Sequence, residues 1–289
     1  MRPETAVLNV QGPYRVYTEF YRSNPGASTV ILVNGSLATT ASFAQTVRNL
    51  TPRLNVVLYD QPYAGKSREH NGHQHLISKA EESRILLDLI EHFRASHVMS
   101  FSWGGACAML ALAQRPRRIE SAVVNSFSPI INPPMRDYLD RGCQALADRN
   151  RQQIATLINA TIGKHLPPLF KRFNHRHVSS LAEQEYAQTQ HHVNEVLHDD
   201  LGTTLTAARD IDVPVLFVNG EWDEYTTPED ARAFGGHVRD ARFVSIAQAG
   251  HFLDMEHKAA CEGHRRVLLG FFEDRGEVRD WKAMRAVAV

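Results

Sequence analysis

The stretch VMSFSWGG, residues 98–105, decides how the rest of this chain is interpreted. An apolar run reaches a serine, and two glycines follow directly. This pattern predicts a nucleophile elbow, in which a buried strand turns sharply into a helix and exposes the Ser102 hydroxyl at the tip. The usual motif is Gly-x-Ser-x-Gly, and here Ser100 replaces the first glycine while Gly104 supplies the second. Serine is small enough for the turn. The alternative is an ordinary strand-to-helix turn with a capping serine.

Partners for this serine follow later in the chain. A hydroxyl is a poor nucleophile near neutral pH unless a base lies within hydrogen-bond distance and a third group orients that base. Asp223 follows the apolar run 215–218, and His251 follows the short run 247–249. The chain order Ser, acid, His is that of the alpha/beta-hydrolases. We therefore predict Ser102, Asp223 and His251 as a catalytic triad.

A second loop is expected beside the elbow. The continuous apolar and β-branched run 29–33 predicts a strand buried on both faces, and the loop NGSLATT, residues 34–40, follows it. Alpha/beta-hydrolases place an oxyanion donor in this loop, which usually begins with His-Gly and here begins with Asn-Gly. A flexible glycine lets the next amide point at the substrate. The backbone N–H groups of Ser36 and Trp103 are the predicted oxyanion hole, and a plain turn is the alternative.

Composition limits the class of protein. The chain has 289 residues, 43% hydrophobic and 22% charged, enough for one α/β domain with an insertion or for two small domains. Lys plus Arg and Asp plus Glu are equal at 32 each, so no overall field directs the chain to nucleic acid or to a membrane surface. No apolar run approaches the ~20 residues of a membrane span. We expect a cytoplasmic protein without a nucleic-acid partner.

Metal and cofactor chemistry is not expected. The three cysteines, at 107, 143 and 261, are unclustered, which argues against a disulfide framework and a zinc site. His70, His73 and His75 lie close together in a loop but lack a nearby set of carboxylates or thiolates. A different acyl-transfer motif, the His-x4-Asp pair of glycerolipid acyltransferases, is absent, because no histidine has an aspartate five positions later. No metal or cofactor is therefore predicted.

The remaining patterns predict the alpha/beta-hydrolase fold, a mostly parallel sheet with helices on both faces and an inserted helical lid. Ser78 and Glu81 have the spacing of a capping box at the start of a helix, and Asp254 is predicted to cap a final helix that ends near Phe272. Further strands are predicted at 56–59, 121–125 and 215–218, after an antiparallel hairpin formed by 6–10 and 14–20.

Residues 131–210 differ from the rest of the chain. The pair Pro133-Pro134 opens a mainly helical section with no strand-like run, between the sixth and seventh predicted strands. We predict a lid there, a core made of 1–130 and 211–275, and a tail at 276–289. The lid stretch 151–182 contains no Asp or Glu. Its basic residues indicate either a solvated helix face or a docking surface for an acidic partner.

Four motifs resemble one narrow branch of this fold, the bacterial acyltransferases that take 3-hydroxyacyl groups from acyl carrier protein. They are the segments 34–40, 101–105, 220–227 and 250–254, and the resemblance runs over nearly the whole chain. It is closer to the branch that supplies polyhydroxyalkanoate synthesis by transacylase or thioesterase activity than to the related rhamnolipid branch. The segments that favour the first branch are 1–4, 16–21 and 135–140.

The resemblance implies a medium-chain (R)-3-hydroxyacyl-ACP substrate, an acyl-enzyme on Ser102, and coenzyme A or water as acceptor. An alternative is condensation of two hydroxyacyl units to 3-(3-hydroxyalkanoyloxy)alkanoic acid, and a second is a non-catalytic member that binds an acyl ligand. Haloalkane dehalogenases and epoxide hydrolases are disfavoured because both need Asp in place of Ser102.

Acyl carrier protein is strongly acidic, so the basic lid residues become candidates for docking it. They are Lys164, Lys171, Arg172 and Arg176.

Overall fold

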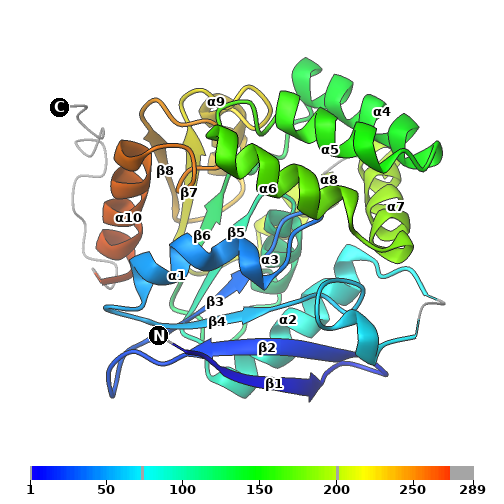
Figure 1. The fold of residues 1–289 in the computed structure, drawn as a ribbon. Coiled ribbons are helices and arrows are strands. Elements are labelled where there is room, and N and C mark those ends of the chain that lie inside the picture. Colours follow the sequence, from blue (N-terminus) through cyan, green and yellow to red (C-terminus); the bar gives the residue numbers. More distant parts are fainter. Residues whose placement is uncertain (1, 73–74, 200–201, 274–289) are drawn as a thin grey trace.

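The computed structural model describes residues 2–72, 75–199 and 202–273. His73 and the predicted tail at 276–289 lie outside these residues. One eight-stranded sheet runs through the molecule in the order β1-β2-β4-β3-β5-β6-β7-β8 (Figure 1). Its strands are β1 (Glu4–Asn9), β2 (Arg15–Tyr21), β3 (Thr29–Val33), β4 (Asn55–Tyr59), β5 (His97–Phe101), β6 (Ser121–Asn125), β7 (Val215–Gly220) and β8 (Ala241–Ile246).

Most of this sheet is parallel. Within the described residues, only the pairs β1·β2 and β2·β4 are antiparallel, and the first of them confirms the predicted hairpin at one edge. The other neighbours, from β4 to β8, pair in parallel. Because parallel strands share one carboxyl edge, the loops that follow β3, β5, β7 and β8 meet there. Those loops carry the oxyanion segment and the three predicted triad residues.

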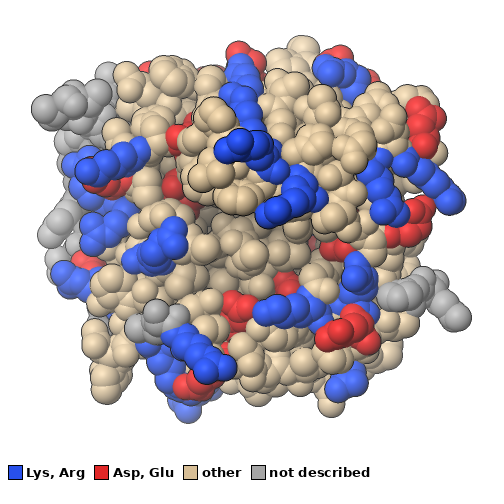
Figure 2. Space-filling view, in the orientation of Figure 1, with Lys and Arg blue, Asp and Glu red and all other residues tan. Residues whose placement is uncertain are grey.

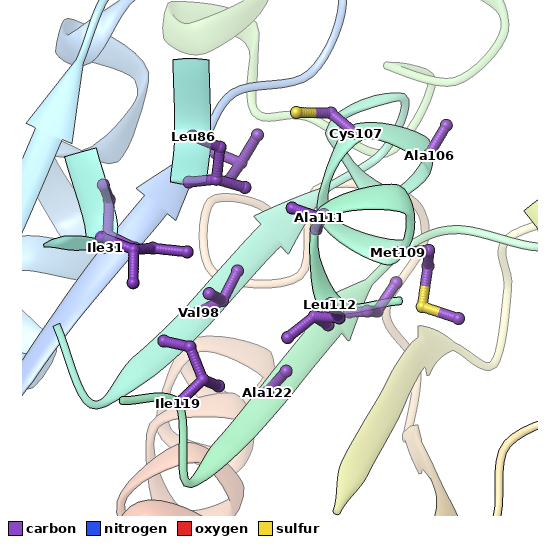
Figure 3. Close-up of a cluster of buried hydrophobic side chains, with 14 of the residues drawn as sticks. Ile31, Leu86, Val98, Ala106, Cys107, Met109, Ala111, Leu112, Ile119 and Ala122 are labelled. Atoms are coloured by element: carbon purple, nitrogen blue, oxygen red, sulfur yellow. The ribbon is translucent and has the colours of Figure 1, made fainter. Parts of the chain in front are cut away.

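Helices cover both faces of the sheet, as the sequence predicted. Alternate residues of β3 show how this arises, because Ile31 belongs to one buried apolar cluster and Leu32 to another. Figure 3 shows Val98 and Ala122 of the first cluster beside the helix that carries Ala111, with Ile31 near Leu86. The first face is covered by α2 (Lys79–Phe93), α3 (Gly104–Leu112) and α8 (Gly202–Ala208), and the second by α1 (Ala44–Leu50) and α10 (Lys258–Glu273).

Four more helices lie between β6 and β7 and gather at the upper right in Figure 1. They share a separate buried apolar cluster that includes Leu139, Ile158, Val178 and Val193. The next helix, α8, differs, because its Ala208 is buried in the cluster on the sheet. The division at 131 and 210 stays a prediction. The four helices are α4 (Pro133–Ala147), α5 (Arg151–Ala160), α6 (Pro168–Ser179) and α7 (Glu183–Asp199).

Two predictions about helix ends have different outcomes. The capping box of α2 is present, since Ser78 accepts from the Glu81 amide and the Glu81 carboxylate accepts from the Ser78 amide. The prediction that Asp254 caps the final helix is wrong. That helix begins at Lys258, and the buried Asp254 carboxylate instead accepts a hydrogen bond from Thr46 of α1 at 2.5 Å. Asp254 therefore joins the last loop of the sheet to α1.

Candidate active site

The elbow geometry is set by backbone packing. Ser102 has a φ of +50°, in the left-handed region that non-glycine residues rarely adopt. A Cβ at Gly104 would clash with the carbonyl oxygens of Val33 and Asn34, so the helix can approach β3 only with glycine there. Ser100, which stands at the first glycine position of the motif, is fully buried. These contacts fix the Ser102 hydroxyl at the carboxyl edge of the sheet.

The three predicted triad residues meet at this edge. His251 Nε2 lies 3.0 Å from Ser102 Oγ, and His251 Nδ1 lies 2.8 Å from Asp223 Oδ2. His251 and Asp223 are both buried, with 4% and 3% of their surface exposed. A nucleophile, a base and an orienting carboxylate in hydrogen-bond contact are the elements of acyl transfer through a covalent intermediate.

Asp223 is held ionised by its neighbours. Its carboxylate accepts from the amides of Tyr225 and Thr226 at 2.9 and 3.1 Å, and from the Thr226 hydroxyl at 2.6 Å. Burial alone would raise the pKa of Asp223. His251 and these hydrogen bonds outweigh burial, so the pKa of Asp223 lies below its ordinary value. The carboxylate can therefore orient an imidazole and stabilise it when it takes up a proton.

Glu256 is a supporting residue that the sequence analysis missed. Its carboxylate accepts from the amides of Gly250 and Phe252 at 2.6 and 3.0 Å, one on each side of His251. Glu256 is itself buried, with 4% exposed. It therefore fixes the backbone of the histidine loop. The available signal was an acidic residue five positions after the histidine, within a segment otherwise treated as the approach to a helix.

The predicted oxyanion loop lies against the elbow. A Cβ at Gly35 would come within 3.1 Å of both the Phe101 carbonyl oxygen and the Ser102 Cβ, so a side chain there would press on the nucleophile. Ser36 and Trp103 both line the cavity in front of Ser102. This arrangement is compatible with two amide donors near the reacting carbonyl, although their role stays a prediction.

A cavity of about 200 Å³ opens at Ser102 and extends under the helices between β6 and β7. Its wall is mainly apolar and includes Leu139, Leu157 and Val193 from three of those helices. A smaller cavity of about 40 Å³ also borders Ser102, and Ser126 and Val196 contribute to its wall. The apolar wall suits an acyl chain whose reactive end meets the serine.

The four candidate docking residues divide into two pairs. Lys164 Nζ forms an ion pair with Glu224 at 2.7 Å, and Lys171 Nζ donates to the Lys164 carbonyl at 2.7 Å. Arg172 and Arg176 of α6 are exposed, and Figure 2 shows basic side chains over this helix. Exposed apolar side chains accompany them on the same helix. These are Leu169, Phe170 and Phe173.

Comparison with known proteins agrees with this geometry. The family model of the alpha/beta hydrolase fold matches residues 28–258. The chain belongs to the alpha/beta hydrolase fold family. An enol-lactonase from Burkholderia xenovorans has the same fold, with a TM-score of 0.76 and 18% identity over 93% of this chain and 100% of that one. An enzyme named MGS-M2, from a deep-sea metagenome, gives a TM-score of 0.75 with 20% identity over 95% and 98%.

Curated relatives of this alpha/beta hydrolase are much closer in sequence. A protein of Pseudomonas putida named (R)-3-hydroxydecanoyl-ACP:CoA transacylase is 66% identical over 273 residues, which cover 94% of this chain and 92% of the relative. A protein of the same name from Pseudomonas aeruginosa is 58% identical over 271 residues, which cover 94% of this chain and 90% of the relative.

None of the described helices is both long and apolar enough to cross a membrane.

Proposed function

We propose that this alpha/beta hydrolase transfers the acyl group of medium-chain (R)-3-hydroxyacyl-ACP to coenzyme A through an ester on Ser102. The observation that carries the proposal is the 66% identity, over 94% of the chain, to a protein named (R)-3-hydroxydecanoyl-ACP:CoA transacylase. The contact between Ser102 and His251 at the mouth of an apolar cavity supports it. A merely ligand-binding member of the fold would not need this pair.

The first half of the proposed reaction loads the enzyme. His251 Nε2 takes the proton from Ser102 Oγ as the oxygen attacks the thioester carbonyl. The backbone N–H groups of Ser36 and Trp103 are assigned to the oxyanion that forms. The C–S bond then breaks, and the carrier thiolate leaves with the proton from His251. Asp223 holds the imidazole and stabilises its charged form during both steps.

The second half reverses these steps with a new thiol. The thiol of coenzyme A gives its proton to His251, and its sulfur attacks the ester carbonyl on Ser102. The C–O bond breaks and Ser102 recovers the proton. Water at the same position would give the free acid, so the same site could also act as a thioesterase.

The size of the smaller cavity bears on the alternative of condensation. That reaction needs a second 3-hydroxyacyl chain beside the acylated serine. The second cavity at Ser102 has about 40 Å³ against about 200 Å³ for the first, so it offers much less room for a second acyl chain. This difference favours an acceptor that presents only a small group to the ester, as a thiol does.

We also propose a cytoplasmic location, because the two proposed substrates, acyl-ACP and coenzyme A, are found in that compartment.

The carrier protein is assigned to the exposed face of α6. Arg172 and Arg176 are exposed there, on a lid stretch that contains no acidic residue. Complementary charge speeds encounter between an acidic carrier and its enzyme. Lys164 and Lys171 are engaged in contacts within the chain, so we assign them a structural part and not a docking role.

The experiment is mass spectrometry of the products formed from 3-hydroxydecanoyl-ACP by the purified protein, with and without coenzyme A. The expected result is 3-hydroxydecanoyl-CoA when coenzyme A is present. The dimeric ester as the main product would replace this proposal by the condensation reaction. Release of the free acid alone, unchanged by coenzyme A, would restrict the activity to hydrolysis. A Ser102→Ala variant controls for uncatalysed thioester exchange.

A further inference from the structure

We propose that the turn Asn125–Phe127, which begins at the last residue of β6, positions all three members of the triad, and that Ser126 is the positioning residue for His251. The inference rests on the proposed function, because it takes Ser102 and His251 as the reacting pair. None of the three turn residues carries the chemistry itself. Each is joined by a hydrogen bond to a different loop of the site.

The first residue of the turn holds the nucleophile strand. The Ser102 amide donates to the Asn125 carbonyl at 2.8 Å, and the Asn125 side-chain amide donates to the Ser100 carbonyl at 2.9 Å. The other end of that side chain is fixed by His264 Nε2, which lies 2.8 Å from Asn125 Oδ1. Burial lowers the pKa of His264 to about 3, so the ring is neutral and its single N–H faces Asn125. Asn125 therefore holds the elbow, and His264 of α10 in turn holds the Asn125 side chain.

The second residue holds the base. The Ser126 hydroxyl donates to the backbone carbonyl of His251 at 2.7 Å, and the Ser126 amide donates to Val218 of β7 at 2.9 Å. Ser126 is fully buried and has a φ of +48°. A non-glycine residue in this left-handed region carries a conformational cost. Here that conformation accompanies a hydroxyl aimed at the histidine loop.

The third residue holds the loop of the acid. The side-chain amide of Asn219 donates both to the Phe127 carbonyl, at 3.3 Å, and to the Thr226 carbonyl, at 2.8 Å. Thr226 in turn donates from its amide and its hydroxyl to the Asp223 carboxylate. Two buried residues, Asn219 and Thr226, therefore connect the turn to Asp223.

One short segment thus sets the relative positions of three loops that lie far apart in the chain. Asp223 and His251 are 28 residues apart, and His251 and Ser102 are 149 residues apart. A displacement of about 1 Å in such a site can cost roughly 100-fold in rate. The Ser126 hydroxyl joins this turn directly to the backbone carbonyl of His251. Its removal should therefore shift His251 without changing the wall of the acyl cavity of about 200 Å³, which Ser126 does not line.

The test compares Ser126→Ala and Ser126→Gly in the full-length protein. Both remove the hydroxyl, while glycine also removes the conformational cost at φ +48° and so safeguards folding. We expect kcat for transfer from 3-hydroxydecanoyl-ACP to fall ~10- to 100-fold in both, with KM unchanged. The rate at which a serine-directed phosphonate modifies Ser102 should fall in parallel. Ser83→Ala is the matched control, because this buried serine also donates to a backbone carbonyl, at 2.8 Å, in α2.

The outcomes separate the possible roles of Ser126. Normal kcat in both variants overturns the proposal. Normal kcat in the glycine variant alone shows that the turn conformation matters and the hydroxyl does not, which also overturns it. A raised KM with normal kcat assigns Ser126 to the smaller cavity that it lines, and again overturns it. If Ser102→Ala itself retains turnover, the proposed function fails instead, whatever the Ser126 variants show.

Discussion

His251 Nε2 lies 3.0 Å from Ser102 Oγ, although 149 residues separate them in the chain. The contact joins the end of β5 to the end of β8, and two strands, β6 and β7, lie between them in the sheet. The two loops must therefore reach across the carboxyl edge. They are held there by two hydrogen bonds, one from the Ser102 amide to the Asn125 carbonyl and one from the Ser126 hydroxyl to the His251 carbonyl. The distance between the two reacting atoms therefore depends on the order of the strands as well as on the two loops that carry them.

Removal of either member of this pair should abolish turnover. Ser102→Ala and His251→Ala are each expected to lower kcat by ~10⁶, whereas Asp223→Ala should cost ~10⁴ because the imidazole survives without its orienting partner. The measurement is kcat for acyl transfer, with melting temperature as the check on folding. The double variant Ser102→Ala/His251→Ala should be no slower than either single one, because the two act as a unit. Additive losses would contradict that.

Acyl chain length should affect activity through burial in the larger cavity. Each buried methylene contributes ~0.8 kcal/mol, so two more carbons should raise kcat/KM roughly tenfold until the cavity is full. A profile without a maximum would contradict an enclosed site.

Gly142 of α4 tests the same idea from the protein side. It lines the larger cavity, and a Cβ there would meet Leu157 at 3.9 Å, which is an ordinary contact distance. Gly142→Leu should shift the optimum toward shorter chains by occupying volume that the acyl tail uses. The measurement is kcat/KM across a series of 3-hydroxyacyl-ACP substrates. Ala187→Leu, which places the same side chain at an exposed position of α7, should leave the profile unchanged.

Asp254 should make stability depend on pH. Burial raises the pKa of this carboxyl from its ordinary 3.8 to about 6, although the hydrogen bond from Thr46 opposes the shift. The folded state then holds its proton to higher pH than the unfolded state, so stability declines from pH 3.8 upward and the full penalty applies above pH 6. Asp254→Asn keeps the acceptor for Thr46 and removes the charge. It should stabilise the fold by at most roughly 3 kcal/mol at pH 7 and have no effect near pH 3.

Urea unfolding at several pH values measures this difference directly. The exposed Asp140→Asn serves as the control for loss of one negative charge. If the free energy of unfolding differs from that of the parent protein by the same amount in the Asp254 and Asp140 variants at every pH, the prediction is wrong. Asp254 would then ionise in the folded state as readily as in the unfolded chain.

Much of the fold could be predicted because buried parallel strands leave a strong pattern. β3 and β6 are buried at every position, so their continuous apolar runs identified both strands and the loops that follow them. The elbow was recognisable because only small residues fit beside β3, as Gly104 shows. Strand order along the chain then predicted that Ser102 and His251 share one edge of the sheet.

The supporting contacts could not be predicted in the same way. Ser126 and Asn219 are ordinary polar residues at strand ends, and their partners depend on three-dimensional register rather than on spacing in the chain. Lys164 belongs to a basic stretch, yet its charge is paired with Glu224, which lies 60 positions later. Asp254 has the sequence context of a helix cap and instead contacts α1. Long-range polar contacts of this kind leave no periodic signal.

Arg172 and Arg176 should affect use of the carrier protein and not the chemical step. Both are exposed on α6, so reversing them together, Arg172→Glu/Arg176→Glu, should raise KM for acyl-ACP tenfold or more at low salt. The parent should lose acyl-ACP activity as salt rises, since the Debye length falls from ~30 Å at 0.01 M to ~10 Å at 0.1 M. Arg117→Glu/Arg239→Glu is the matched control, because these exposed residues precede β6 and β8 at the opposite edge of the sheet. A small neutral thioester should be unaffected by either pair, and an equal loss on that substrate and on acyl-ACP would assign α6 a structural role and place the carrier elsewhere.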